Sequence, residues 1–287
     1  EKYTTTRDII SYGITKEHEA GLTTENGGVH LSFQHIPEEK LREAFGPVID
    51  KLAANGIDLT KDTVEVAPIA HYHMGGIRVN GQMETSITGL YGAGEVVGGA
   101  NGANRLSGNA IPEAFVFGER AGRFAAEYAR GRNRVWSDAA AQEHLDLLNT
   151  LIGRQSDGSG DKAALGEMWF ELQNLMWEKV GVLRTGDKLA AALTRIREMR
   201  VTLADMVPAD DAEFNMTLQD WYDLRSALLT AESVTLAAIN RTESRGAHQR
   251  EDFEEMDPAQ VHNQRLRLGD DGEVLSDYLP VAKGVAA

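Results

Sequence analysis

The chain of 287 residues contains no cysteine. Without a thiol it cannot form a disulfide, supply a thiolate nucleophile or hold an iron-sulfur cluster, so any such cluster must come from a partner. The absence also fits a reducing compartment such as the cytoplasm. Positive charge is scarce as well, because 29 Lys and Arg residues face 44 Asp and Glu residues and leave a net charge of -15. This balance argues against nonspecific binding to nucleic acids or acidic membranes.

Long apolar runs are also missing. No run of about 18 apolar residues could span a bilayer, and the first residues lack the charged-then-apolar layout of a signal peptide. The apolar fraction of 42% is ordinary for a globular protein, and the length suffices for one large or two ordinary domains. The sequence therefore predicts a soluble, globular chain.

Glycine, by contrast, is concentrated in one stretch. Ten of the 29 glycines lie between Gly75 and Gly108, and backbone without Cβ atoms can closely approach a flat or phosphorylated ligand. The segment GLYGAGE predicts a short strand that ends in a tight turn with Glu95 at its tip, where a carboxylate suits a sugar hydroxyl. The following NAIPEAFVFGERAG predicts a helix with Asn109 as its N-cap, whose first N–H groups would face the same ligand.

The first 70 residues predict a mixed segment. A helix is expected to begin at Arg7 and to end before Gly21, followed by a strand at GGVHLSF and a helix over PEEKLREAFGPVIDKLAANG. VEVAPIAHYHM then predicts an extended strand with His71 and His73 on one face. The apolar side chains expected on one side of the second helix are Leu41, Phe45, Val48 and Leu52.

From about residue 134 a helical pattern replaces the glycines. A polar glycine-serine linker, GRQSDGSGDK, interrupts it, and QRLRLGDDGEVLSDYLPV predicts two strands joined by a DDG turn. The charge-dense RTESRGAHQRED by itself indicates solvated surface. Three helices are expected to pack through apolar stripes, which comprise Leu165, Met168, Trp169, Leu172, Leu175 and Met176, then Leu189, Leu193 and Ile196, then Leu218, Trp221, Leu224 and Leu228.

The chain resembles one known family in segments that follow the family's order and spacing: HYHMGGI, GLYGAGEV, GANRLSGNAI and VFGERAG. The family is the flavoprotein subunit of succinate dehydrogenase and fumarate reductase, whose relatives include L-aspartate oxidase. The likeness lies in the carboxyl-terminal half of that flavoprotein. It extends to TTTRDII, GGVHLSFQHIP, LMWEKVGVLRT and RTESRGAHQREDF, so it covers nearly the whole chain.

The resemblance implies an α/β plus α fold, in which the remnant of a FAD-binding domain and a capping domain precedes a helical bundle. It divides the chain into the end of a substrate-capping domain at 1–70, the C-terminal part of a FAD-binding domain at 71–133, a helical bundle domain at 134–258 and a C-terminal tail at 259–287. It also places RTESRGAHQRED back against the flavin domain or a partner.

The resemblance implies roles for three substrate-binding or catalytic residues. Arg7 in TTTRD corresponds to the proton donor of the family, although its spacing alone favours an ion pair with Asp8 or the capping of a neighbouring element. His71 and Arg105 correspond to the two anchors of the substrate carboxylates, and a guanidinium fork matches two oxygens at once. His71 and His73 also form an HxH pair, but no third ligand of suitable spacing is evident, so we predict no metal site.

The resemblance further implies FAD as the cofactor. Glu95 matches the residue that bonds the FAD ribose, and the backbone at Asn109, Ala110 and Ile111 matches the segment that lies against the isoalloxazine ring. Two positions depart from the family pattern. Asn101 stands before GANR where the family usually has histidine, and Ser32 replaces the aspartate common in GGVxLD. Both departures leave room for a substrate other than fumarate.

The function implied is interconversion of succinate and fumarate by hydride transfer with FAD. An iron-sulfur subunit is the expected partner of the complete enzyme, and the expected location is cytoplasmic, either free or peripheral to the membrane through partner subunits. Two alternatives stay open. One is L-aspartate oxidase or another FAD-dependent dehydrogenase of the same family, and the other is a noncatalytic assembly fragment.

One expected motif is absent. No GxGxxG follows a predicted strand near the N-terminus, although this motif normally holds the pyrophosphate of FAD. We therefore expect a fragment, or one part of a split subunit, whose missing N-terminal half of the flavoprotein lies elsewhere. Such a chain alone is expected to be inactive and to self-associate through the surface that the missing half would cover.

Overall fold

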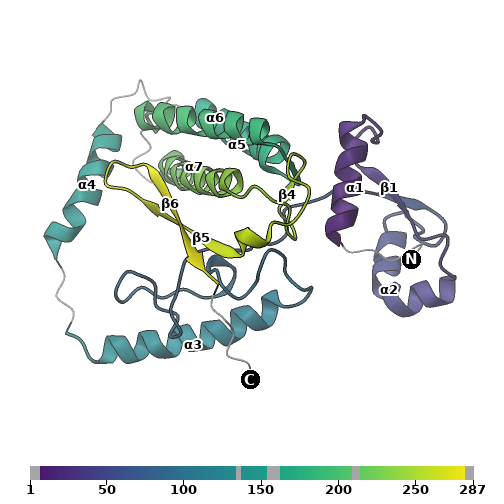
Figure 1. The fold of residues 1–287 in the computed structure, drawn as a ribbon, viewed down its shortest axis with the longest axis horizontal. Helices are drawn as coiled ribbons and strands as arrows, with labels where there is room; N and C mark the ends of the chain where they lie inside the picture. Colours follow the sequence, from purple (N-terminus) through teal and green to yellow (C-terminus); the bar gives the residue numbers. More distant parts are fainter. Residues whose placement is uncertain (1–6, 134–136, 154–161, 209–213, 282–287) are drawn as a thin grey trace. The chain divides into compact units, whose positions relative to one another are not determined.

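The computed structural model describes residues 7–133, 137–153, 162–208 and 214–281. The chain divides into two compact units, Glu1–His73 and Met74–Ala287 (Figure 1). Both units combine helices with short two-stranded sheets, and the second contains a helical C-terminal part. The four-part division at residues 70, 133 and 258 stays a prediction.

The first unit contains α1 (Arg7–Glu19), β1 (Val29–Ser32), α2 (Glu38–Ala53) and β2 (Thr63–Val66). The strands pair antiparallel with Val29 opposite Val66, and Gly21 follows α1 with a φ of 72°. The expected first helix, its glycine stop and the first strand are therefore confirmed. The small core of this unit consists of Leu41, Ile49 and Leu59, with Phe33, Ile36, Leu52 and Val64 packed against them.

The predicted apolar face of α2 is partly wrong. Leu41 and Leu52 do face the core, but Phe45 and Val48 are 44% and 50% exposed, and Ile49 is buried instead. The cause is a kink at Phe45, whose φ of -133° and ψ of 18° are not helical, two residues before Pro47. A proline within a helix removes a backbone donor and disturbs the preceding turn. The second half of α2 therefore turns a different set of residues inward.

The predicted strand over VEVAPIAHYHM is also wrong beyond its first residues. Strand β2 ends at Val66, two residues before Pro68, and no regular element covers residues 67–73. Proline cannot donate a hydrogen bond to a neighbouring strand, which explains the early end. His71 and His73 are both exposed in this irregular segment, so they do not lie on the face of a strand.

The glycine-rich part of the second unit contains the 3-10 turn η1 (Gly94–Val96) and the long helix α3 (Ala110–Arg130). The expected strand over GLYGAGE is wrong, because only a single bridge from Tyr91 to Glu84 forms there. Gly89 and Gly94 have φ values of 85° and 77°, which no extended strand contains. The small core beneath consists of Met83, Val97 and Ala121, with Val79, Tyr91, Ala93 and Phe117 beside them.

The helical part consists of α4 (Asp138–Gly153), α5 (Lys162–Val180), α6 (Gly186–Asp205) and α7 (Met216–Asn240). Figure 1 shows α5, α6 and α7 packed beside one another. The predicted stripes are confirmed, since nine of their residues are buried in the largest core: Leu165, Met168, Leu172, Leu175, Leu189, Ile196, Trp221, Leu224 and Leu228. The predicted glycine-serine linker lies almost entirely outside the described residues.

Short elements complete the second unit. Strand β3 (Leu183–Arg184) pairs in parallel with β4 (Gln249–Arg250), and η2 (Pro258–Gln260) precedes the hairpin of β5 (His262–Leu268) and β6 (Val274–Pro280). The predicted two strands with a DDG turn are thereby confirmed. The hairpin lies along α7 (Figure 1).

An ion cluster around one buried carboxylate joins the hairpin to the bundle. Glu232 of α7 is fully buried and accepts hydrogen bonds from Arg197, at 2.8 Å, and from Arg200. Arg200 also donates to the carbonyl of Gly272 in the hairpin turn, at 3.2 Å. Because a buried carboxylate requires such partners, the cluster fixes where the turn meets α6 and α7.

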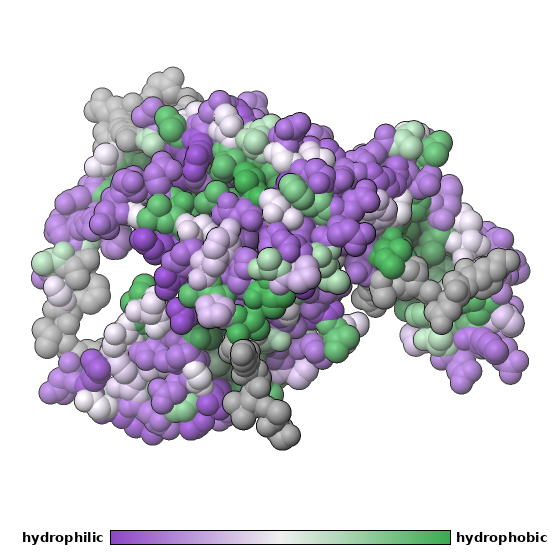
Figure 2. Space-filling view, viewed as in Figure 1, coloured by the Kyte–Doolittle hydropathy of each residue, from purple (hydrophilic) through white to green (hydrophobic). Residues whose placement is uncertain are grey.

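The visible surface in Figure 2 is mostly hydrophilic, in agreement with the acidic composition, with apolar residues showing between the helices. Within the described residues, no helix combines the length and apolar character needed to cross a bilayer.

Candidate functional site

Two glycine-rich segments meet backbone to backbone. The amide of Ile77 donates to the carbonyl of Val96 at 2.8 Å, and the amide of Gly98 donates to the carbonyl of Ile77 at 3.1 Å. A Cβ on Gly76 would collide with the Val96 carbonyl, and one on Gly98 would lie 3.0 Å from the carbonyl carbon of Gly75. Only glycine allows this approach. The MGGI and GAGEV segments therefore form one scaffold.

Helix α3 and the turn η1 pack directly on each other. Gly94 is buried, and a Cβ at this position would make ordinary contact with Ala114 of α3, at 3.7 Å. Glu95, the next residue, is exposed. Glu95, the residue expected to bind the FAD ribose, therefore lies at the surface of a turn that packs on α3.

The start of α3 differs from the prediction in one detail. Asn109 occupies the N-cap position, but its φ of -65° and ψ of -19° are already helical and its side chain makes no capping hydrogen bond. A capping side chain needs an extended backbone to reach the free N–H groups, which explains the difference. Ala110 is half-buried, while Ile111 is 67% exposed. The helix therefore presents its first turn, with Asn109 and Ile111, to the surface.

Arg105 lies in an irregular loop between η1 and α3. Its side chain is half-buried, and its Nη1 donates to the carbonyl of Leu106 at 2.9 Å. On one side the loop is tied to α3, because the side-chain amide of Asn101 donates to Glu113 at 3.0 Å and Glu113 is buried in the first turn of α3. Asn101, which departs from the family pattern, therefore has a structural partner.

The predicted site residues belong to both units. Glu95, Arg105 and the Asn109–Ile111 backbone lie on the glycine-rich scaffold of the second unit. Arg7 and His71 belong to the first unit. Arg7 is the first residue of α1, and its side chain lies outside the described part of the structure, whereas His71 is exposed in the segment after β2.

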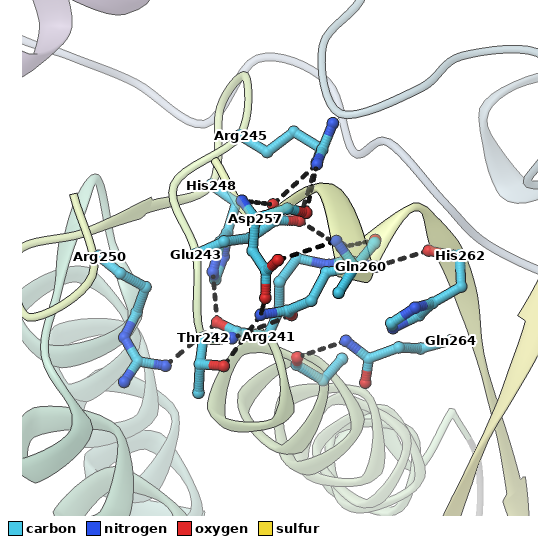
Figure 3. Close-up of polar contacts among 12 residues, drawn as sticks. Arg241, Thr242, Glu243, Arg245, His248, Arg250, Asp257, Gln260, His262 and Gln264 are labelled. Atoms are coloured by element: carbon cyan, nitrogen blue, oxygen red, sulfur yellow. Dashed lines mark hydrogen bonds and ion pairs between the residues drawn. The ribbon is translucent and has the colours of Figure 1, made fainter. Parts of the chain in front are cut away.

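The structure adds a polar network that the charge pattern failed to predict (Figure 3). Glu243 in RTESRGAHQRED is fully buried. Arg245 binds both of its carboxylate oxygens at 2.8 Å, and Arg241 binds one of them at 2.6 Å. The hydrogen bond from Arg245 is the largest cause that lowers the pKa of Glu243 to about 2. The expectation of a solvated surface is therefore wrong, because the charges neutralise one another in pairs.

His248 lies inside the same network. Its Nδ1 is 2.8 Å from Nη1 of Arg184, and its Nε2 is 3.0 Å from the carbonyl of Arg241. Because a guanidinium can only donate, Nδ1 must accept and Nε2–H must donate, which fixes the neutral tautomer. Burial, followed by the charge of Arg184, lowers the pKa of His248 to about 4. The histidine is therefore held uncharged.

The network also binds the ends of three helices. Arg250 donates to the carbonyl of Ala238 near the end of α7, at 3.0 Å, and pairs with Asp252 at 2.7 and 2.8 Å. Asp252 accepts from the amide of Gly186 at the start of α6, at 2.8 Å, and Arg184 donates to the last carbonyl of α5, at 3.0 Å. Cations at helix C-termini and an anion at an N-terminus complement the helix dipoles.

The tip of this segment touches the loop that contains Arg105. The amide of Ala247 donates to the carbonyl of Ala103 at 2.9 Å. The resemblance implied a placement against the flavin domain or a partner, and this contact agrees with the first, while the assignment of residues 71–133 to that domain stays a prediction. The alternation of positive and negative charges in RTESR is a sequence signal for ion pairs, but it does not indicate burial.

Known protein families match most of the chain. A model of the FAD binding domain matches residues 2–111, and a model described as the fumarate reductase flavoprotein C-terminus matches residues 170–284. The fumarate reductase (CoM/CoB) of Methanothermobacter marburgensis contains a polypeptide that is 37% identical over 253 residues, which cover 88% of this chain and 45% of that polypeptide. The L-aspartate oxidase 2-b of Nicotiana tabacum is 33% identical over 234 residues, which cover 78% of this chain and 35% of that enzyme.

Solved structures agree with these matches. The Sdh1 complex of Mycobacterium smegmatis in its apo form contains a chain that matches with a TM-score of 0.81 and 32% sequence identity. The match covers 97% of this chain and 48% of the Sdh1 chain. The chain thus spans less than half the length of each of these three proteins. The matches, the glycine scaffold and the motif order agree, and the chain belongs to the family of flavoprotein subunits of succinate dehydrogenase and fumarate reductase.

Proposed function

We propose that the chain is part of a FAD-dependent oxidoreductase that interconverts succinate and fumarate, and that it supplies anchors for the substrate and the inner part of the flavin site. The observation that carries this proposal is the agreement of two family matches, to the FAD binding domain and to the fumarate reductase flavoprotein C-terminus; the first of them contains Glu95, Arg105 and the start of α3.

The residues around the start of α3 fit a flavin. Ile111 and Phe115 are 67% and 76% exposed, and apolar side chains beside a helix N-terminus suit a flat ring system with polar edges. We assign the ribose hydroxyls to Glu95 and the ring to the backbone of Asn109, Ala110 and Ile111. When bound, FAD supplies the hydride acceptor or donor of the reaction.

The substrate anchors are His71 and Arg105. Each is assigned to one carboxylate of the dicarboxylate, and both positions come from motifs that match the family. A guanidinium can bond two carboxylate oxygens in parallel, which fixes the orientation of the carboxylate as well as its position. A half-buried place such as that of Arg105 strengthens the pairing, because less water competes for the charges.

Arg7 is assigned to proton delivery at the substrate carbon next to the one that exchanges hydride. A guanidinium has a pKa above 12, so it can act as an acid only when its proton is replaced as it leaves. Arg7 is therefore proposed as the last member of a proton relay. The carboxylates that would refill it belong to the part of the flavoprotein outside this chain.

The proposal includes a partner that carries electrons. The chain has no cysteine with which to hold an iron-sulfur cluster, so the proposed electron carrier is an iron-sulfur subunit, with attachment to a membrane through partner subunits. L-aspartate oxidase is the second candidate, favoured by 33% identity to the tobacco enzyme. It would use the same two carboxylate anchors and remove hydride from a carbon that bears an amine.

The test is a kinetic comparison in the complete flavoprotein. Succinate oxidation, fumarate reduction and L-aspartate oxidation are measured with artificial electron carriers. Arg105→Lys should raise KM for the dicarboxylate by about tenfold or more and lower kcat, because lysine lacks the bidentate fork. Arg123→Lys is the matched control, since Arg123 lies on the surface of α3 between Glu119 and Glu127. Turnover of L-aspartate alone would favour the second candidate, and unchanged kinetics in Arg105→Lys would refute the anchor role.

A further inference from the structure

We propose that Gly246 is a positioning residue for Arg105, acting through a direct backbone contact with the loop that contains this arginine. The inference rests on the proposed function, because it assumes that Arg105 anchors a carboxylate. Gly246 lies more than a hundred residues after Arg105 in the sequence, and neither the composition nor a motif links the two positions.

Gly246 lies in a tight turn between Arg245 and His248. The amide of Arg245 donates to the carbonyl of His248 at 2.8 Å, and the amide of His248 donates back to the carbonyl of Arg245 at 3.0 Å. Gly246 has a φ of 58°, in the left-handed region that favours glycine and tolerates asparagine. The turn therefore has a defined shape with Gly246 and Ala247 at its tip.

Both ends of the turn are held by buried charges. Arg245 makes two parallel hydrogen bonds to the buried carboxylate of Glu243 (Figure 3). The His248 ring is fixed between Arg184 and the carbonyl of Arg241. Arg184 in turn bonds the end of α5. Because the helical bundle holds these groups, the tip of the turn is a rigid support.

The tip of the turn contacts Ala103 so closely that a Cβ atom at Gly246 would not fit between them. The amide of Ala247 donates to the Ala103 carbonyl at 2.9 Å. A Cβ at Gly246 would lie 2.5 Å from the Ala103 oxygen, 2.7 Å from its carbonyl carbon and 2.9 Å from its Cβ. Real Cβ atoms do not approach backbone this closely, so any other residue at this position must displace Ala103.

Ala103 precedes Arg105 by two residues. The loop is held on its other side by the hydrogen bond between Asn101 and Glu113 of α3. The backbone of GANR is therefore fixed between α3 and the turn at Gly246. A shift of Ala103 moves Arg105, and a displacement of about 1 Å in a binding group can slow a reaction by about a hundredfold.

The experiment uses Gly246→Asn in the complete flavoprotein. After glycine, asparagine tolerates a φ near 58° best, so this variant is the least disruptive to the turn while its added Cβ still collides with Ala103. The ratio kcat/KM for succinate should fall by about tenfold to a hundredfold, chiefly through a higher KM, because Arg105 is proposed to bind the substrate. The matched control is Gly272→Asn in the β5–β6 turn. Gly272 has a φ of 80° and nothing within 4 Å of an added Cβ, so its KM should stay within about twofold of wild type.

A double-mutant cycle with Arg105→Lys separates positioning from general damage. If Gly246 acts through Arg105, the double variant should have a KM within about twofold of Arg105→Lys alone. Arg245→Lys provides a second route, because it loosens the turn without adding atoms at the contact. Arg245→Lys should raise KM by a smaller factor than Gly246→Asn. Combined with Arg105→Lys, it should leave KM close to that of Arg105→Lys alone. This variant decides the question if Gly246→Asn fails to retain flavin absorbance and a normal unfolding midpoint.

Each result has one meaning. An unchanged KM in folded Gly246→Asn, or effects that multiply in the double variant, would overturn the positioning role while the proposed function stands. A wild-type flavoprotein that turns over neither succinate nor fumarate would overturn the proposed function, and the positioning role with it. If Gly246→Asn raises KM in the wild-type background but not in the Arg105→Lys background, the result supports both the positioning role and the proposed function.

Discussion

His248 should make the stability of the helical bundle depend on pH above the range in which carboxylates titrate. The neutral ring accepts a hydrogen bond from Arg184 and donates one to the carbonyl of Arg241. Protonation would place a second N–H and a positive charge against the guanidinium of Arg184. The charges that disfavour protonation are, in order, those of Arg184, Arg241 and Arg250, after the larger effect of burial.

The size of the effect follows from the two pKa values of His248. The pKa falls from 6.5 in an ordinary histidine to about 4 in the folded protein. At about 1.4 kcal/mol per pKa unit, this difference corresponds to about 3 kcal/mol. The unfolded chain binds the proton first, so this contribution to stability is fully present above the ordinary pKa of 6.5. It is lost as the pH falls from 6.5 toward about 4.

Urea unfolding at a series of pH values measures the loss. Tryptophan fluorescence reports mainly on the bundle, because Trp169, Trp177 and Trp221 lie in α5 and α7. The free energy of unfolding should fall by about 3 kcal/mol between about pH 7 and about pH 4. His248→Gln, which can accept from Arg184 and donate to Arg241 while staying neutral, should remove most of this fall.

A second histidine, His262, provides the control. His262→Gln should retain the pH dependence, because the His262 ring lies against the ring of Tyr278 and the hydrogen bond from Arg241 goes to the backbone carbonyl of His262, which the substitution keeps. The paired carboxylates Glu243 and Asp252 have pKa values of about 2, so their contributions are lost at more acidic pH. A slope between pH 6.5 and about pH 4 that is equal in wild type and His248→Gln would refute the assignment.

Three further outcomes are expected. In the complete flavoprotein, Arg7→Ala should abolish dicarboxylate turnover while flavin absorbance and dicarboxylate binding largely persist, since proton delivery acts in the transition state; substantial residual turnover would place the proton donor elsewhere. Glu95→Gln should weaken FAD binding by about tenfold, as measured by fluorescence quenching, and an unchanged affinity would contradict the ribose contact. Residues 1–287 alone should bind FAD weakly and self-associate, because no GxGxxG motif is present to hold the pyrophosphate; a monomer that binds FAD tightly would disprove this expectation.

Elements with a strong local signal were predictable. The apolar stripes of α5, α6 and α7 became the largest core because a period of about 3.6 residues places such side chains on one face of each helix. The DDG segment became the turn of the β5–β6 hairpin, where Gly272 has a φ of 80°. The motifs that carry the family resemblance are likewise contiguous in the sequence, so their order could be recognised without coordinates.

Other features depended on contacts that no local pattern describes. The kink at Phe45 changed which residues of α2 are buried, and Pro68 ended β2 before the histidines. Gly76 and Gly98 let two backbone segments pair through the parallel bridge of Ile77 and Val97, because neither glycine carries a Cβ that would collide with the other segment.

The sequence by itself determined the helical bundle, the terminal hairpin and membership of the flavoprotein family, since each is encoded in neighbouring residues. Tertiary structure decided that Glu243 and Arg250 of RTESRGAHQRED are buried and that its turn supports the loop of Arg105. The reason is physical: a polar side chain stays in water unless a hydrogen-bond partner is near, and the partner of His248 is Arg184, 64 residues away. Only the folded chain brings such groups together and, through Gly246 and Ala103, connects them to the proposed substrate anchor.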